Sequence, residues 1–177
     1  MNVTLRPLAA RDIEAVFAIY DDEVLRGTAT FDTAPSTPES RAAWLSAHGA
    51  GARPAIVAVG DGGEIAGYAA LSAYSDRLAY ARTAENSVYV HRAHRGRGIG
   101  RLLLAALLGG AREAGISVLV ARITTESVAS RALHVSLGFR PVGTLRRVGE
   151  KFGRILDVEI LDRHLDEDAP RPGAGTP

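Results

Sequence analysis

Apolar residues along this chain follow either helical or strand-like spacing, and each kind marks a set of elements. Helical spacing predicts helices over residues 12–24, 37–48, 99–114 and 127–137. Alternating or continuous β-prone runs predict strands over residues 3–8, 55–59, 64–71, 85–90, 116–123, 140–145 and 155–161.

The order of these predicted elements indicates the fold class. Turn residues at 61–63 join two adjacent strands into an antiparallel hairpin, whereas the strand, helix and strand over 85–123 must cross over in parallel. A sheet with both kinds of connection is expected to carry helices on both faces. The sequence therefore predicts an α/β protein with a mixed sheet.

The length and ends of the chain suggest one domain. Its 177 residues suffice for one well-buried core, which we expect to span residues 1–165. Residues 166–177 are rich in proline, glycine and acidic side chains without periodic apolar positions, which predicts a disordered tail. The sequence shows neither a secretory leader nor a run of about 18 apolar residues, so we predict a cytoplasmic protein without a membrane partner.

Charge and composition exclude several kinds of partner. Lys and Arg number 21 against 20 Asp and Glu, so the net charge of +1 gives no basic field of the kind that binds nucleic acid. Without cysteine, the chain has no disulfide, thiolate metal ligand or cysteine nucleophile. We also predict no metal, because no recognised ligand spacing joins the histidines His48, His91, His94, His134 and His164.

Residues 87–101 combine a β-prone run, a basic turn and the start of a predicted helix. Gly96, Gly98 and Gly100 let backbone N–H groups approach a ligand, and a helix start favours negative charge, which predicts a bound phosphate. A Walker-type loop is excluded because Gly100 is followed by arginine and leucine. A dinucleotide fingerprint is excluded because the glycines recur at every second position and the next strand lacks a terminal acid.

Several separated stretches resemble one family. Arg95-Gly96-Arg97-Gly98-Ile99-Gly100 resembles the acyl-CoA pyrophosphate loop of the GNAT N-acetyltransferases, and the element order over 3–162 is similar to their fold. Residues 129–139 resemble the second half of their cofactor site. Closer similarity, to the phosphinothricin and methionine-sulfone acetyltransferase branch, is found in residues 28–32, 85–91 and 148–157. The resemblance implies the GNAT acyl-CoA N-acyltransferase fold in a single domain.

This resemblance also implies an activity, the transfer of acetyl from acetyl-CoA to the primary amine of a small amino acid or analogue by direct attack. An α-amine with a pKa of about 8 is mostly protonated at neutral pH, so something must remove its proton. Glu85 matches the family's active-site carboxylate and is the predicted general base, acting directly or through a water. His134 stands where many members place the tyrosine that protonates the leaving thiolate, and is the predicted acid.

For acetyl-CoA, the resemblance implies one strand and one loop. The main chain of Val88, Tyr89 and Val90 is expected to pair with the pantetheine arm and to polarise the acetyl carbonyl. Ser136 matches a cofactor contact, and Ser127 stands where the family usually has asparagine, which changes one contact. The pyrophosphate is expected against Arg95, Gly96, Arg97, Gly98, Ile99, Gly100 and Arg101.

The acceptor half of the pattern departs from the family. Ser75 occupies the place of an expected arginine, Asn86 that of a histidine in close relatives, and Ile155 that of a tryptophan. We therefore expect the acceptor site to be the part retuned to another amine. The predicted walls and carboxylate clamps of that site are Phe31, Arg77, Tyr80, Arg82 and Phe152.

Other interpretations fit the same residues. A peptide or protein N-acetyltransferase would act on N-termini in an open groove, and a sensor domain would bind acyl-CoA without transferring the acyl group. Glu85 is also compatible with a solvated strand end, His134 with a structural helix position, and the turn's arginines with ordinary solvated charges. Family members commonly form homodimers with the acceptor site near the interface, so the resemblance also implies a homodimer.

Overall fold

The computed structural model describes residues 2–48 and 53–166. Within them, a seven-stranded sheet runs in the order β1-β2-β3-β4-β5-β7-β6. The β4–β5 pair is parallel and the other neighbouring pairs are antiparallel, which confirms the predicted mixed sheet. Apart from residue 166, the predicted tail lies outside the described residues. The strands are β1 (Val3–Pro7), β2 (Ala55–Gly60), β3 (Ile65–Ala73), β4 (Thr83–Val90), β5 (Val118–Thr124), β6 (Arg140–Lys151) and β7 (Arg154–His164).

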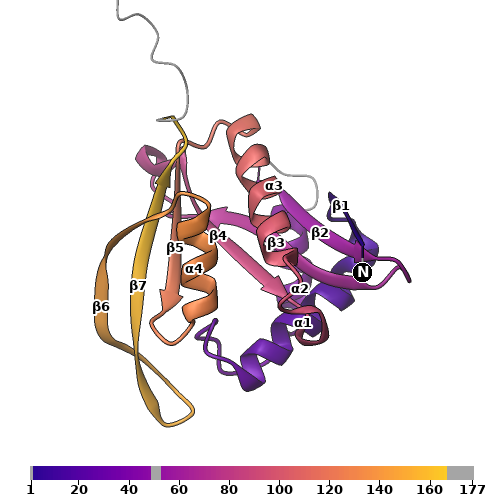
Figure 1. Ribbon diagram of the computed structural model, residues 1–177, viewed down its shortest axis with the longest axis horizontal. Helices are drawn as coiled ribbons and strands as arrows, with labels where there is room; N and C mark the ends of the chain where they lie inside the picture. The colour runs from indigo at the N-terminus through magenta and orange to yellow at the C-terminus, as the bar shows by residue number, and fades with distance from the viewer. Residues whose placement is uncertain (1, 49–52, 167–177) are drawn as a thin grey trace, which may run out of the picture.

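Helices cover both faces of the sheet, as predicted. Helices α1 (Ile13–Arg26) and α2 (Pro38–His48) lie on one face, and α3 (Ile99–Glu113) and α4 (Val128–Ser136) lie on the other (Figure 1). In the described part of the chain, no helix is both long enough and apolar enough to cross a membrane.

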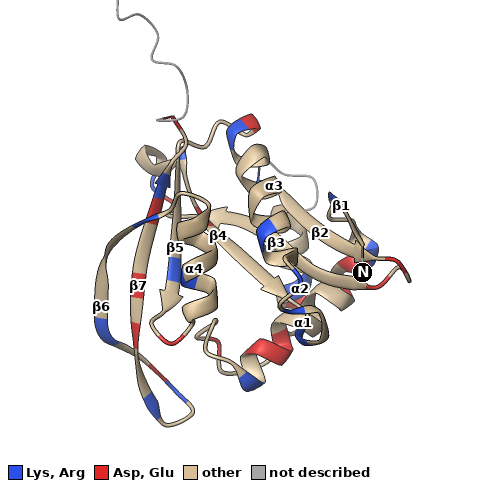
Figure 2. Ribbon diagram, in the orientation of Figure 1, with Lys and Arg blue, Asp and Glu red and all other residues tan. Residues whose placement is uncertain are grey.

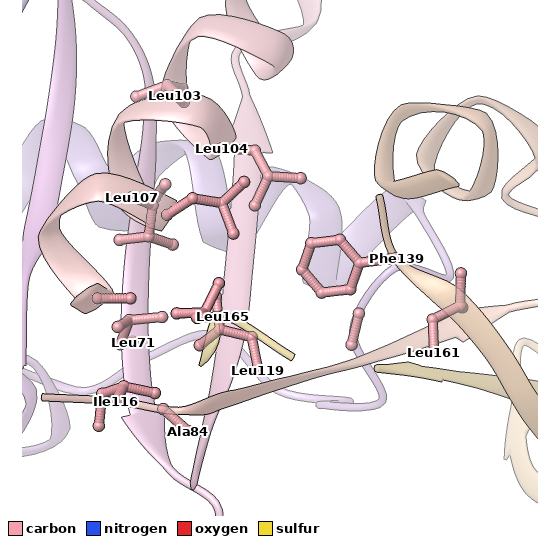
Figure 3. Close-up of a cluster of buried hydrophobic side chains, with 14 of the residues drawn as sticks. Leu71, Ala84, Leu103, Leu104, Leu107, Ile116, Leu119, Phe139, Leu161 and Leu165 are labelled. Carbon is pink, nitrogen blue, oxygen red and sulfur yellow. The ribbon is translucent and has the colours of Figure 1, made fainter. Parts of the chain in front are cut away.

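Each face of the sheet has its own apolar core. Leu104 and Leu107 of α3 pack with Leu119 and Phe139 (Figure 3). On the opposite face, Phe17 of α1 meets the Trp44 ring of α2 edge-on at a centroid distance of 5.6 Å. Burial of each large apolar side chain contributes about 1.5–3 kcal/mol, so the two cores hold the central strands in place.

The start of α1 differs from the sequence prediction, in which Asp12 caps the helix. Asp12 has helical angles, and its side chain makes no capping hydrogen bond to α1. Its carboxylate instead accepts hydrogen bonds from Arg6, at 2.6 and 2.7 Å, and from the Ala9 N–H at 2.8 Å. The Arg6 guanidinium thereby lowers the pKa of Asp12. The carboxylate thus ties the turn before α1 to β1.

The β6–β7 hairpin is longer than the sequence predicts. β6 continues to Lys151 instead of ending near residue 145. Residues 140–148 are all exposed, so no apolar alternation marks the full length of the strand. The register shifts between Leu145 and Gly149, where Arg147 has a φ of 55°. The hairpin tip extends beyond the rest of the sheet (Figure 1), and both signs of charge lie along it (Figure 2).

Candidate active site

The sheet opens at its centre, between β4 and β5. These strands pair only from Thr83↔Val118 to Glu85↔Val120 and then diverge (Figure 1). The opening holds a small cavity of about 80 Å³ whose lining includes Asn86, Ser87, Ser127 and His134. The Oδ1 of Asn86 is buried there without a hydrogen-bond partner among the described residues. A buried acceptor of this kind suits a ligand that brings an N–H or O–H group.

The glycine turn follows β4 as predicted. Gly96 and Gly98 have φ angles of 74° and 78°, in the left-handed region that glycine adopts without strain. Gly98 is the N-cap of α3, and the N–H groups of a first helical turn lack intrahelical partners. A Cβ built on either glycine would meet no atom within 4 Å. The main chain of the turn is therefore open to a ligand.

Arg95 of this turn and Arg101 at the start of α3 are already engaged within the protein. Arg95 donates hydrogen bonds to Glu23 at 3.0 Å and to the Val90 carbonyl at 3.1 Å. Arg101 donates a 2.7 Å hydrogen bond to the Ser136 hydroxyl. These contacts brace the turn against α1 and α4, and they bring together two residues predicted to contact the cofactor. The arginines supply positive charge, and the N–H groups are the open donors.

A larger cavity of about 780 Å³ lies beside the opening. Its walls come from residues 28–37, from α1 and α2, and from strands β3 to β7. Its charged lining residues are Asp32, Glu85 and Arg122. Asp32 accepts a 2.7 Å hydrogen bond from Tyr20, whose pKa burial raises to about 12, so this hydroxyl stays protonated. The size and the mixed lining suit a small polar molecule.

Glu85 lines both cavities and pairs with Arg122 of β5. Arg122 donates from Nε to Oε1 at 2.9 Å and from Nη2 to Oε2, so the guanidinium grips both carboxylate oxygens. This hydrogen bonding to Glu85 raises the pKa of Arg122. The exposed fractions of the two side chains are 21% for Glu85 and 59% for Arg122. The pair is therefore accessible from the larger cavity.

His134 of α4 is buried beside the opening between β4 and β5, which we call the split. Its Nδ1 lies 2.8 Å from the Ser130 carbonyl, an acceptor, so Nδ1 carries the proton. Its Nε2 lies 2.9 Å from Asn86 Nδ2 and therefore accepts from that amide when the ring is neutral. Burial lowers the pKa of His134, which favours this neutral form.

The loop after α1 is fixed from two sides. The Ala29 N–H donates to Glu23 at 3.1 Å, and the Lys151 ammonium donates to the Thr30 carbonyl at 2.7 Å. Lys151 is 3% exposed, and burial lowers its pKa. Lys151 therefore connects the end of β6 to the cavity wall.

The structure brings some predicted acceptor residues to the larger cavity and leaves others away from it. Phe31 lines the cavity, whereas Arg77, Tyr80, Arg82 and Phe152 are exposed and do not line it. Arg82 contacts the Gly115 carbonyl and Asp166 instead. Their substrate-binding roles stay predictions.

Sequence reasoning missed Arg122 and Lys151. Arg122 follows Ala121 in a strand that the pattern identifies only as buried, and Lys151 lies in the motif that resembles the family. A charged residue inside an otherwise apolar strand was the available signal for Arg122.

The arrangement of these residues fits acetyl-CoA. The open main chain at Gly96 and Gly98 suits a pyrophosphate, and the unpaired β4 edge with the orphaned Asn86 oxygen suits the amide-bearing pantetheine arm. Residues 2–48 and 53–166 include no cluster of three or more His, Asp or Glu side chains that could hold a metal ion. The predicted absence of a metal stays a prediction.

Comparison with known proteins identifies the class. Residues 13–139 match the acetyltransferase (GNAT) family, and this chain belongs to that family. The chain is thus an acetyl-CoA-dependent N-acetyltransferase, and the predicted fold is confirmed.

Particular relatives cover almost the whole chain. The L-methionine sulfoximine/L-methionine sulfone acetyltransferase of Pseudomonas paraeruginosa is 37% identical over 97% of this chain and 100% of its own. The phosphinothricin N-acetyltransferase of Streptomyces coelicolor is 39% identical over 93% of this chain and 97% of its own. The solved structure of a GNAT superfamily phosphinothricin acetyltransferase from Sinorhizobium meliloti with AcCoA has a TM-score of 0.91 and 35% identity, covering 99% of this chain and 96% of that one.

Proposed function

We propose that this enzyme acetylates the α-amine of a small amino acid or analogue, of the phosphinothricin or methionine-sulfone type, with Glu85 as general base. The observation that carries the proposal is that Glu85 lines both the split between β4 and β5 and the larger cavity. A thioester in the split and an amine in the cavity would meet at this carboxylate. The names of the relatives support the type of acceptor.

The chemistry needs a polarised carbonyl and a route for one proton. Acetyl-CoA supplies an activated carbonyl carbon and a thiolate leaving group. A main-chain N–H group of residues 88–90 is suited to polarise that carbonyl. Glu85 takes the proton that the amine loses, directly or through a water, as the new C–N bond forms and the C–S bond breaks. The departing thiolate then takes a proton.

His134 is the proposed source of that last proton. Its support is its position beside the split, where it lines the small cavity. Its Nε2 accepts from Asn86 in the neutral ring, so donation from Nε2 requires a second proton, which burial opposes. We expect His134→Gln to lower kcat by about 100-fold at an unchanged acetyl-CoA KM. An unchanged kcat rejects the role.

The test of the proposed function is an assay of CoA release from acetyl-CoA with a panel of acceptors. The panel contains phosphinothricin, L-methionine sulfone, L-amino acids and a peptide with a free N-terminus. We expect turnover above hydrolysis with the small amino acids and much less with the peptide. CoA release no faster than hydrolysis with every acceptor rejects the proposal.

Glu85→Gln tests the base in the same assay. We expect kcat to fall by about 10²- to 10⁴-fold while the affinity for acetyl-CoA is unchanged, because the carboxamide keeps the shape but cannot take a proton. Glu64→Gln, in the exposed turn between β2 and β3, is the matched control and should behave as the wild type. A Glu85→Gln enzyme with the wild-type rate and pH profile removes the assignment.

The proposal includes a homodimer and a cytoplasmic location. Support for the dimer comes from β6, whose exposed Val142, Leu145 and Val148 leave apolar surface at the sheet edge next to the cavity. Sedimentation velocity is expected to give twice the chain mass of 18.7 kDa. Leu145→Glu is expected to shift the protein toward monomer, and a wild-type monomer contradicts this part of the proposal.

A further inference from the structure

We propose that Arg122 recognises the carboxylate of the acceptor and exchanges its ion pair with Glu85 for one with that carboxylate. The inference rests on the proposed function and specifies how the acceptor is selected.

Arg122 is placed to do this by the distribution of charge around the cavity. Of the described residues that line the larger cavity, Arg122 is the only lysine or arginine. Arg77 and Arg82, the clamps predicted from the sequence, do not line it. The expected arginine is replaced by Ser75. The cation of this cavity therefore comes from β5, in which Arg122 is the one basic residue.

The Glu85–Arg122 pair complements an α-amino acid. Such a molecule carries an amino group and a carboxylate on one carbon, so its two groups lie as close together as the side chains of the pair. With the carboxylate on the guanidinium fork of Arg122, the amine lies against Glu85, the proposed base. A plain amine supplies only one of these contacts, and so does a peptide N-terminus, whose adjacent carbonyl is an uncharged amide.

The exchange is physically easy. Arg122 is 59% exposed, so a carboxylate from the cavity can reach its guanidinium, and the exchange replaces one charge-assisted pair by another of the same kind. Without an acceptor, the guanidinium engages both oxygens of Glu85. Its transfer to the acceptor releases those lone pairs for the amine proton. Acceptor binding and availability of the base are thereby coupled.

The experiment compares L-methionine sulfone with its carboxamide, in which an uncharged amide replaces the carboxylate. We measure kcat/KM for both acceptors in the wild type and in Arg122→Gln. The wild type is expected to prefer the acid, and Arg122→Gln should lower kcat/KM for the acid by about 10- to 100-fold, mainly through KM. The kcat/KM of Arg122→Gln for the carboxamide should stay the same or rise, because no guanidinium then competes with the amine for Glu85.

Two further variants sharpen the result. Arg26→Gln, which breaks an exposed ion pair with Asp22 on α1, is the matched control and should keep the wild-type preference. Arg77→Gln tests the rival clamp. If Arg77→Gln abolishes the preference for the acid and Arg122→Gln does not, the proposal is overturned. An equal loss for acid and carboxamide in Arg122→Gln also overturns it, since Arg122 then acts only on Glu85.

A binding measurement separates this inference from the proposed function. L-Methionine sulfone and its carboxamide are titrated calorimetrically into wild type and Arg122→Gln, each saturated with CoA. If the wild type transfers acetyl to no acceptor, the proposed function fails. Acid-selective binding that Arg122→Gln loses still supports the inference, and equal binding of both compounds to the wild type overturns it.

Discussion

Lys151 Nζ donates a 2.7 Å hydrogen bond to the Thr30 carbonyl, so the end of β6 holds the loop that forms one wall of the larger cavity. Lys151→Met removes this donor and leaves a buried carbonyl without it. We expect the free energy of unfolding to fall by about 1–3 kcal/mol, partly offset because a buried ammonium is also removed.

The loop should also become less well positioned, so the acceptor KM should rise in Lys151→Met while the acetyl-CoA KM is unchanged. Urea unfolding and steady-state kinetics measure both effects, with Arg26→Met as the control for loss of an exposed cation. A variant as stable as the wild type, with the same acceptor KM, would show that this hydrogen bond does not matter.

Gly98→Ala tests the anion turn. Gly98 has a φ of 78°, and the methyl group of an alanine there would meet no atom within 4 Å. The substitution is therefore opposed by backbone strain of about 1–2 kcal/mol and not by a clash. We expect weaker acetyl-CoA binding, measured by calorimetry.

The control for this variant is Gly115→Ala, which imposes the same kind of strain at a φ of 75°, at the other end of α3. It should lose stability without losing acetyl-CoA affinity. Equal losses of affinity in Gly98→Ala and Gly115→Ala contradict a local role for the turn.

Gly149→Ala tests the contact between β6 and the cavity wall. A Cβ at Gly149 would lie 2.1 Å from Phe31 Cε2, so the Phe31 ring must move. We expect a loss of stability of about 1–3 kcal/mol and a higher acceptor KM. At Gly143, in the same strand, a Cβ would meet nothing within 4 Å, so Gly143→Ala is the control. If the two variants have the same acceptor KM, Phe31 does not shape the acceptor site.

His134 predicts a pH dependence of stability. Burial lowers its pKa in the folded protein below the value of 6.5 for the free side chain. As the pH falls below 6.5, the unfolded chain therefore binds more protons at this residue than the folded protein, and stability falls by at most about 1.4 kcal/mol per pH unit until the folded pKa is passed.

The measurement is the difference in unfolding free energy between pH 7.5 and pH 5.0, for wild type and His134→Gln. The variant should lose less stability over this interval, because glutamine does not titrate. Val128→Gln, at an exposed position of α4, changes no titratable group and should keep the wild-type dependence. An equal loss of unfolding free energy between pH 7.5 and pH 5.0 in wild type and His134→Gln would refute the prediction.

Much of the fold could be predicted because each core-facing element repeats its apolar residues with its own period. α3 is an example, with Leu103, Leu104 and Leu107 on one face. The far half of β6 could not be predicted, because residues 146–148 are exposed and carry no such period. Its pairing depends on β7 instead.

The conformation of the glycine turn could be predicted because the turn is local in sequence, with Gly96 and Gly98 where the left-handed angles are needed. The larger cavity depends on contacts between distant segments. Arg122 meets Glu85 only because the parallel register of β4 and β5 is set by the crossover through α3. Lys151 meets Thr30 across 121 positions of sequence. No local pattern contains either contact.

The divergence of β4 and β5 makes the centre of the sheet incomplete on its own. A co-substrate that binds there only in the folded protein adds stability by mass action, about 2.7 kcal/mol at a concentration 100 times its dissociation constant. The resistance of this enzyme to unfolding and proteolysis should therefore rise and fall with the cellular supply of acetyl-CoA. Acetyl-CoA, which the enzyme consumes, should therefore also lengthen the lifetime of the enzyme.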